Sequence, residues 1–217
     1  MFMTSAVAYA ITGSVEISLS IGLIDTFFKI FTYYGFDILW TKLSRKKYKT
    51  SVVWLTGLSG SGKTTIGREM FERLKKEGIP AMLLDGDEIR EMFKQTGFDK
   101  ESRDRHVENV GKMAAFLQKR GIVAIVTLIA PYEEVRNKCR DMVSNFIEVH
   151  VNTSLEVCEA RDVKGLYKKV RAGEIKQFTG IHSDAPYEQP SNPELTIDTE
   201  DKTVDQCVKI ILTKLKK

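Results

Sequence analysis

The stretch GLSGSGKTT, residues 57–65, constrains this chain more than any other part of it. It matches the pattern G-x-x-x-x-G-K-[ST], whose fixed positions here are Gly57, Gly62, Lys63 and Thr64. A β-prone apolar run, residues 51–56, comes directly before the stretch, and a helix-like run, residues 66–77, comes directly after it. Strand, loop and helix in this order are the context that a phosphate-binding loop requires.

The chemistry of this loop follows from its shortage of side chains. A glycine-rich loop can wrap its backbone N–H groups around a polyphosphate, and the next helix points the positive end of its dipole at the same anion. In this pattern Lys63 reaches the β- and γ-phosphates, and the Thr64 hydroxyl is a ligand of Mg²⁺. We expect the nucleotide to be bound by Gly57, Ser59, Gly60, Ser61, Gly62, Lys63, Thr64 and Thr65.

The positive charge of the chain is concentrated at its N-terminus. The formal net charge is +4, and residues 1–50 hold six Lys/Arg against three Asp/Glu, so most of the excess lies there. The remainder is nearly balanced, whereas a nucleic-acid-binding face needs clustered basic residues, so we expect no nucleic-acid binding. The three cysteines lie far apart without C-x-x-C spacing, which predicts neither a zinc site nor a disulfide framework and suits a cytosolic compartment.

The first 44 residues differ in kind from the rest. Residues 17–40 are long enough to span a membrane, but they carry three charged side chains. Asp25 and Lys29 lie one helical turn apart, so they can pair on a narrow polar stripe while aliphatic and aromatic side chains cover the remaining surface. A basic linker, residues 45–50, follows, as expected where a membrane segment emerges on the cytoplasmic side.

Three arrangements fit residues 1–44: a membrane hairpin or span, a helix lying in the membrane interface, and a soluble helix packed on the body. A secretory signal peptide fits poorly, because no basic segment precedes the apolar run. The segment ITGSVEISLSIGLIDTFFKIFTYYGFDILW resembles a small two-helix membrane domain of unknown function that is fused to some sulfur-assimilation kinases. That resemblance implies a membrane-associated N-terminus, with the first helix only partly present, and a kinase domain on the cytoplasmic side.

Beyond residue 50 the pattern changes to strands and helices in alternation. Strands are expected at residues 52–56, 81–85, 123–128, 146–151 and 195–198. Helical runs such as 102–120 and 132–143 separate them. This alternation predicts one α/β domain, residues 51–217, in which about five strands form a parallel sheet of the phosphate-loop NTPase type with helices on both faces. Functional residues should then lie just beyond the carboxyl ends of the strands.

The second expected strand ends in two acidic residues, Asp85 and Asp87, within LLDGDEIR. The third strand ends without an acid, so the usual source of the metal-organising aspartate in phosphate-loop enzymes is missing. Asp85 and Asp87 can replace it, one carboxylate near Mg²⁺ and one within reach of the hydroxyl that accepts a phosphoryl group. We assign Asp85, with Thr64, to the metal and Asp87 to the acceptor. The alternative is a turn in which aspartate only caps a helix.

From residue 51 onward the chain resembles the adenylylsulfate (APS) kinase family. The resemblance is carried by GLSGSGKTT, LLDGDEIR, TGF with Arg103 after it, LIAPY, FIEVHVN, LEVCEARDVKGLYKKVRAGEIKQFTGI and PYEQPSNPEL. Residues 159–181 discriminate best, because nucleoside, shikimate and gluconate kinases share only the phosphate loop and the strand-two acid. The resemblance implies transfer of the γ-phosphoryl group of ATP to the 3′-hydroxyl of APS, with Mg²⁺ as cofactor, and a homodimeric assembly.

The same resemblance implies roles for individual residues. Arg90 and Arg103 would hold the phosphosulfate, and Phe98 and Phe178 would stack on the adenine of APS. The basic segment that begins at Arg161 would be a mobile lid over the phosphoryl group, although a charge run of this kind can also be a solvated helix face. The implied catalytic residues are Lys63, Asp85, Asp87, Arg161 and Lys164. The implied substrate-binding residues are Asp87, Arg90, Phe98, Arg103, His106, Ile129, Lys164, Leu166 and Phe178.

Two positions depart from the family pattern. His106 stands where most members have asparagine; it can still donate one hydrogen bond to the substrate, but a lone helical histidine is equally well a surface residue. Ala130 stands where the family commonly has serine before the proline of the third strand. A phosphoserine intermediate is therefore impossible at this position, and direct in-line transfer is the consistent mechanism.

Other functions remain open at this point. Another small-molecule kinase of the same fold, acting on a nucleoside or a sugar acid, would share the phosphate loop. A membrane-tethered nucleotide-binding adaptor without catalysis is a second alternative, and the intact Lys63, Thr64, Asp85 and Asp87 argue against it. A regulatory GTPase is disfavoured, because the sequence has no N-K-x-D motif for guanine.

Overall fold

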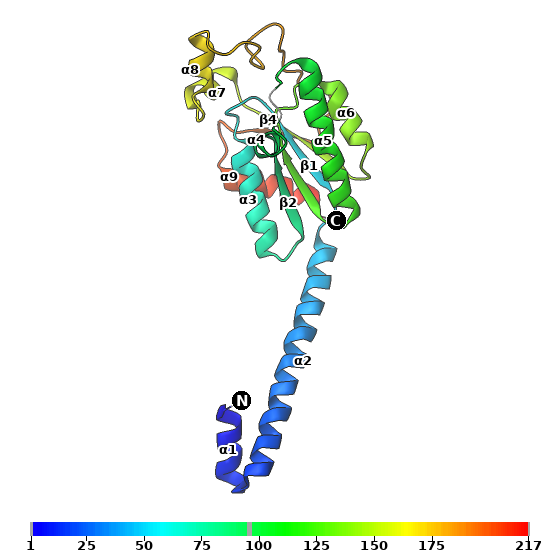
Figure 1. The fold of residues 1–217 in the computed structure, drawn as a ribbon, viewed down its shortest axis with the longest axis vertical. Helices are drawn as coiled ribbons and strands as arrows, with labels where there is room; N and C mark the ends of the chain where they lie inside the picture. The colour runs from blue at the N-terminus through cyan, green and yellow to red at the C-terminus, as the bar shows by residue number, and fades with distance from the viewer. Residues whose placement is uncertain (1, 95–96, 217) are drawn as a thin grey trace. The chain divides into compact units, whose positions relative to one another are not determined.

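The computed structural model describes residues 2–94 and 97–216 and divides into two compact units, Met1–Lys46 and Lys47–Lys217 (Figure 1). The first unit contains helices α1, Phe2–Thr12, and α2, Val15–Lys47. Because α2 continues through Lys47, the linker expected at residues 45–50 begins inside a helix. The second unit holds every strand among the described residues.

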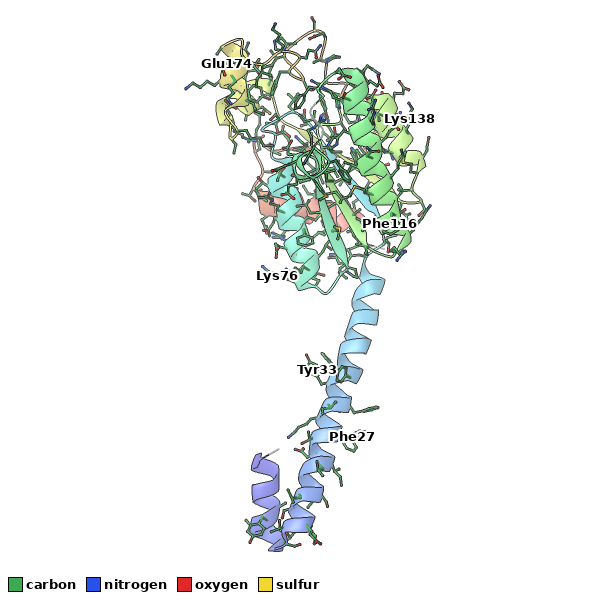
Figure 2. All side chains as sticks on the ribbon, viewed as in Figure 1. Phe27, Tyr33, Lys76, Phe116, Lys138 and Glu174 are labelled. Atoms are coloured by element: carbon green, nitrogen blue, oxygen red, sulfur yellow. The ribbon has the colours of Figure 1, made fainter. Side chains whose placement is uncertain are left out.

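The N-terminal unit is a helical hairpin that turns at Gly13, which has a φ of 64°. Small residues form the contact between the two helices, since Ala8 on α1 and Ser18 on α2 are both buried. The large apolar side chains point outward instead, and Figure 2 shows Phe27 and Tyr33 projecting from α2. By a hydropathy criterion, no helix in the described part of the chain is both long and apolar enough to cross a membrane.

The second unit is built on a five-stranded parallel sheet, as the alternating pattern predicts. The strands are β1 Val52–Thr56, β2 Ala81–Asp85, β3 Val123–Thr127, β4 Phe146–Asn152 and β5 Leu195–Asp198. Their order in the sheet is β2-β3-β1-β4-β5, and every neighbouring pair is parallel. Two of the predicted strand ends, those of β3 and β4, differ from the structure by one residue, and the other boundaries agree fully. The strand that ends in Asp85 is therefore separated from β1 by β3.

Helices cover both faces of this sheet. They are α3 Lys63–Lys76, α4 Gly86–Met92, α5 Lys100–Lys119, α6 Glu133–Asp141, α7 Leu155–Arg161, α8 Leu166–Arg171 and α9 Val204–Leu215. Figure 1 shows α3 and α9 on one side of the strands and α5 and α6 on the other.

The alternation of side chains along β1 explains this two-sided packing. Val53 and Leu55 belong to the cluster that contains the apolar residues of α3 and α9, whereas Val52 and Trp54 belong to the cluster of α5 and α6. All four are completely buried, because successive side chains of a strand point to opposite faces and both faces are covered. The central strand β1 is thus held rigidly, and the phosphate loop begins at its carboxyl end.

Candidate active site

The phosphate loop (residues 57–65) connects β1 to α3 and packs closely on its surroundings. A Cβ atom added to Gly57 would lie 2.5 Å from the carbonyl oxygen of Val151, so this position accepts only glycine without a shift of the backbone. The Lys63 ammonium lies in the loop and donates to the carbonyl oxygens of Gly57 at 2.9 Å and Leu58 at 2.7 Å. Burial lowers the pKa of Lys63 to about 8.

The Lys63 ammonium thus places a positive charge inside the loop, where a polyphosphate would bind. Lys63 as a whole is 8% exposed, and its ammonium is held by neutral carbonyl groups, which are weak partners for a buried charge. A phosphate oxygen is a stronger partner, because an ionic hydrogen bond is about twice as strong as a neutral one. A polyphosphate bound in the loop could therefore replace the carbonyl partners of Lys63.

Asp85 lies at the carboxyl end of β2 and joins the phosphate loop to the rest of the site. Its Oδ2 accepts hydrogen bonds from the hydroxyls of Thr64 at 2.8 Å and Thr127 at 2.9 Å, and its Oδ1 accepts from the Asp87 amide at 3.0 Å. Burial alone would raise the pKa of Asp85, but these hydrogen bonds together lower it, so the carboxylate stays ionised. Asp85 does cap α4, and it also bonds the loop threonine.

The register of the sheet explains how Asp85 reaches Thr64. Thr127 on β3 lies opposite Leu55 on one side and opposite Asp85 on the other, so these residues share one level of the sheet. The Thr127 hydroxyl donates to the same Asp85 oxygen that accepts from Thr64, so it holds the carboxylate in place beside the loop. Thr127 was not among the predicted site residues, although a hydroxyl at the end of the otherwise apolar strand VAIVT was a usable signal.

The oxygens of Thr64 and Asp85 suit a magnesium ion. Mg²⁺ prefers oxygen ligands, and proteins usually supply one or two carboxylates while phosphates and water complete the octahedron. No group of three or more His, Cys, Asp or Glu side chains in the described part of the chain could hold a metal ion by itself. An ion here would therefore be shared between these two side chains, the nucleotide and water.

Asp87 and Lys164 form an ion pair in the structure, although they are 77 residues apart in the chain. Asp87 lies in the first turn of α4, and Lys164 lies in the turn before α8. Both side chains are more than half exposed, and both act electrostatically on Lys63. The predicted acid, the phosphate-loop lysine and one lid lysine thus lie together at the carboxyl edge of the sheet.

Arg90 and Phe98 form one side of the region that we assigned to the acceptor. The Arg90 guanidinium lies over the Phe98 ring at 4.8 Å from its centroid and donates to the carbonyl oxygen of Gly97 at 2.8 Å. Phe98 is 59% exposed, so one ring face can receive a further planar group.

Arg103 connects this side to the segment that carries Phe178. It is buried, donates to the Phe98 carbonyl oxygen at 2.6 Å, and also bonds the Thr179 hydroxyl and the Gln177 carbonyl oxygen. The structure thus shows Arg103 bonding protein groups that flank both predicted adenine-stacking rings.

His106 is not a surface residue, so that alternative was wrong. The side chain is 3% exposed, and burial, followed by the nearby Arg90 charge, lowers the pKa of His106 to about 4. It is therefore a neutral imidazole at neutral pH and lies close to Arg90, Asp87 and the backbone of Gly86. A neutral imidazole can offer one N–H donor without adding charge beside the arginine.

The end of β3 is held by side chains from two other elements. The Ile129 carbonyl oxygen accepts from the Thr56 hydroxyl at 2.6 Å, and the Ala130 carbonyl oxygen accepts from Arg136 at 2.7 Å. Ala130 has a φ of 43°, which is uncommon for a residue other than glycine. The backbone at Ile129, a predicted contact residue, is thus held in place by hydrogen bonds on both sides of the turn.

The remaining lid residues lie around the phosphate loop. The Arg161 guanidinium donates to the hydroxyl and the carbonyl oxygen of Thr199, and the Thr199 hydroxyl in turn donates to the Ser61 carbonyl oxygen at 3.2 Å. Leu166 is the first residue of α8 and is half-buried. Thr199 was not among the predicted site residues either, since its only signal in the sequence is its place directly after the fifth strand.

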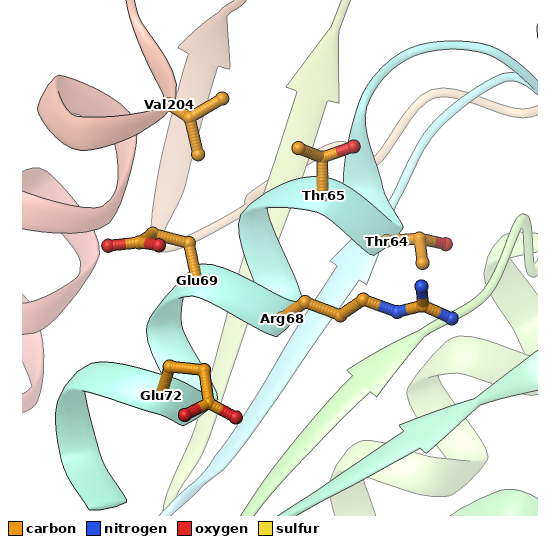
Figure 3. A pocket seen from close by; sticks show the side chains of 6 residues that line it. All are labelled: Thr64, Thr65, Arg68, Glu69, Glu72 and Val204. Atoms are coloured by element: carbon orange, nitrogen blue, oxygen red, sulfur yellow. The ribbon is translucent and has the colours of Figure 1, made fainter. Parts of the chain in front are cut away.

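A hollow of about 370 Å³ lies beside the loop, on the outer side of α3 (Figure 3). Thr64 and Thr65 border it at one end, and Glu69, Glu72 and Val204 line the rest together with Arg68. Two carboxylates against one guanidinium make this lining unfavourable for a polyphosphate.

Comparison with protein families gives two matches along the chain. Residues 49–198 match the family model described as adenylylsulphate kinase, and residues 1–41 match the model of a predicted membrane protein, DUF2061. The adenylyl-sulfate kinase of Rippkaea orientalis (strain PCC 8801 / RF-1) is 47% identical over 170 residues, which cover 78% of this chain and 93% of that protein. The adenylyl-sulfate kinase of Gloeothece citriformis (strain PCC 7424) is 46% identical, covering 78% and 96%.

Solved structures give the same family. The Mycobacterium tuberculosis APS kinase in complex with AMPPNP and APS is 37% identical, with a TM-score of 0.72 and coverage of 77% of this chain and 99% of that chain. A hexameric APS kinase from Thiobacillus denitrificans is 32% identical, with a TM-score of 0.58 and coverage of 79% of this chain and 29% of that chain.

Proposed function

The chain belongs to the adenylylsulfate kinase family, and from that premise we propose how its residues divide the reaction between them. The protein is a kinase of sulfate assimilation that moves the γ-phosphoryl group of ATP to the 3′-hydroxyl of APS, giving 3′-phosphoadenylyl sulfate and ADP. The observation that carries the division of roles is the Thr64–Asp85 hydrogen bond, because it joins the nucleotide loop to the end of β2, directly before the turn of α4 that carries Asp87.

The phosphate loop and α3 bind ATP. Backbone N–H groups of the loop and the N-terminus of α3 hold the phosphates, and Lys63 exchanges its carbonyl partners for phosphate oxygens. Thr64 and Asp85 would hold Mg²⁺, which when bound supplies positive charge to the β- and γ-phosphate oxygens. Arg161, which bonds Thr199 beside the loop, lies on the nucleotide side of the site.

Asp87 and Lys164 act on the transfer itself. The Asp87 carboxylate accepts the proton of the 3′-hydroxyl while the bond from the 3′-oxygen to the γ-phosphorus forms and the bond from that phosphorus to the ADP oxygen breaks. Before the transfer, Lys164 separates from Asp87, which frees the carboxylate to accept the proton. The Lys164 ammonium then donates to the phosphoryl group while it is being transferred. Ala130 has no nucleophilic atom, so the phosphoryl group passes directly from donor to acceptor.

The proposed acceptor site takes its residues from α4, from α5 and the residues just before it, from α8 and the segment after it, and from the end of β3. Phe98 and Phe178 stack on the adenine, and Arg90 and neutral His106 donate to the phosphosulfate. Arg103 contributes by holding the backbone beside both rings, in addition to any contact with the substrate. Leu166 and the backbone of Ile129 complete the walls.

We expect APS to be the preferred acceptor in an assay of ADP release with purified protein. The kcat/KM for APS should exceed that for a nucleoside, gluconate or shikimate by at least about 10³-fold, because a site built to bond polar groups rejects ligands that lack them. Boiled protein and a reaction without acceptor are the controls. Turnover of a sugar acid or a nucleoside in place of APS would overturn the substrate assignment.

We also propose that the N-terminal hairpin associates with a membrane and places the kinase unit on the cytoplasmic side. Phe27, Phe31 and Tyr33 are each at least 70% exposed, which leaves a large apolar surface without protein cover within this unit. Several polar side chains in the described part of α2 are paired within the helix. Asp25 accepts from Lys29 at 2.6 Å, and hydroxyls of α2 donate to carbonyl oxygens four residues earlier, as Thr26 does to Gly22.

Such pairing supports a lipid environment, because hydrocarbon offers no water to satisfy polar groups. It fits an inserted hairpin and a helix lying in the interface equally well. The resemblance of residues 1–41 to a predicted membrane protein supports the same proposal.

We expect the full chain to sediment with membranes and a chain lacking residues 1–45 to remain in the supernatant with the same kcat. The shortened chain keeps Tyr48, whose bridge to Lys216 ties the start of the kinase unit to its last helix. Equal solubility of the two chains would contradict the membrane proposal.

We also propose that two kinase units pair as a homodimer. Light scattering of the shortened chain should then give twice the mass of one chain.

A further inference from the structure

The tip of the phosphate loop is packed against the segment that leads from α7 to the predicted acceptor site. The Ser59 carbonyl oxygen accepts a hydrogen bond from the Tyr167 hydroxyl at 2.8 Å. A Cβ atom added to Gly60 would lie 2.9 Å from the Cys158 carbonyl oxygen, so α7 approaches the loop backbone directly. These contacts come from parts of the chain about 100 residues away from the loop.

A third contact lies on the neighbouring loop residue. A Cβ atom added to Gly180 would lie 2.5 Å from the Leu58 side chain, so the backbone two residues after Phe178 packs on the loop. Three consecutive loop residues, 58–60, therefore touch the segment that carries the predicted adenine-stacking ring.

Tyr167 is the side chain that joins these two regions. It is 1% exposed, and burial raises the pKa of its hydroxyl, so the phenol remains a neutral donor. The backbone amide of Tyr167 donates to the Asp162 carboxylate at 3.0 Å, which fixes the start of α8. The ring meets the Phe178 ring edge-on, with centroids 5.1 Å apart and an angle of 72° between the planes. Such a geometry is favourable for aromatic pairs.

The side chain is thus held at both ends: its hydroxyl bonds the nucleotide loop, and its ring contacts Phe178. A shift of the Ser59 carbonyl group would move the Tyr167 hydroxyl, and a shift of the Tyr167 ring would remove the edge contact with Phe178. Among the described residues, Tyr167 is the only one of residues 158–182 whose side chain donates a hydrogen bond to the Ser59 carbonyl oxygen.

We infer that Tyr167 is a positioning residue that places the Phe178 ring relative to the phosphate loop, so that the acceptor adenine is bound at the correct distance from the γ-phosphate. This inference rests on the proposed function, because it takes Phe178 as a contact of the acceptor. Tyr167 touches neither substrate in this proposal. It acts through Phe178, and its hydrogen bond sets where that ring lies.

The test is a Tyr167→Phe substitution, which removes the hydroxyl and keeps the ring. Losing one buried hydrogen bond should raise the KM for APS about threefold to tenfold and leave kcat within about twofold. Tyr48→Phe is the matched control, because Tyr48 is equally buried and its hydroxyl donates to Glu77 at the opposite end of the strands. The control should leave both constants unchanged.

A double substitution distinguishes positioning from a general loss of structure. If Tyr167 acts through Phe178, Tyr167→Phe should change the KM for APS less than twofold in a Phe178→Leu background, since coupled residues are not additive. If the two substitutions instead raise the KM for APS independently, so that the increase in the double variant is the product of the single increases, the inference is wrong. An equal rise in the KM values for ATP and APS together with a lower melting temperature would also overturn it, because that result indicates a structural role. Failure of the proposed function is a separate result, in which the unsubstituted protein does not phosphorylate APS.

Discussion

We expect Asp87→Asn to lower the kcat for phosphorylation of APS by about 10²–10⁴-fold, the range typical for removal of a general base. Asparagine has nearly the same shape as aspartate, but its amide cannot take up the proton of the 3′-hydroxyl. The substitution also removes the negative partner of Lys164, whose charge then remains available to ATP. Affinity for a non-hydrolysable ATP analogue should therefore change by less than about threefold.

The matched control for this prediction is Glu88→Gln. Glu88 is the next residue of α4, and its carboxylate pairs with Arg68 at 3.0 Å on the exposed surface. Loss of this exposed pair should leave kcat within about twofold, since such pairs contribute little. A kcat of Asp87→Asn above one tenth of the unsubstituted value would show that Asp87 is not the base.

Lys63→Met is expected to lower kcat/KM for ATP by about 10²–10³-fold, because it removes a preorganised positive charge from the transferring phosphate. Lys76→Met, at the end of the same helix α3, is the matched control and should have no measurable effect. The two variants are compared in steady-state assays with saturating APS.

The pH dependence of ATP binding provides a second measurement on Lys63. The pKa of about 8 means that the ammonium of the free protein loses its proton as the pH rises through 8, and the neutral amine binds phosphate less well. ATP affinity should therefore fall between pH 8 and 10 in the unsubstituted protein, and the fall should be absent in Lys63→Met. An unchanged affinity up to pH 10 would show that Lys63 stays charged without the nucleotide.

Most of the fold follows from local patterns. Most strands are short apolar runs bounded by polar residues, and the helical runs 66–77, 102–120 and 132–143 have the spacing of a helix, so neighbours two to four positions apart are enough to identify them. The phosphate loop is equally local, because its glycines, Lys63 and Thr64 all lie within nine residues. Asp85 and Asp87 were predicted for the same reason, since the carboxyl ends of parallel strands meet at one edge.

The contacts that assemble the site depend instead on packing between distant segments. Whether Asp85 could reach Thr64 depended on the position of β3 between β1 and β2, and on the Thr127 hydroxyl at that level. The burial of His106 depended on what covers its face of α5, which no spacing along the helix reveals. The residue type at each position therefore indicates which chemistry is possible there, whereas the packing of distant segments decides which groups meet.

The strands, the nucleotide loop and the acids beside it could all be predicted from residue patterns, because those features arise from residues close together in the chain. The partners of Arg103, Lys164 and Tyr167 became evident only in three dimensions, because long side chains can reach several neighbours. Which neighbour each one meets is set by the order of the strands and the path of the loops between them.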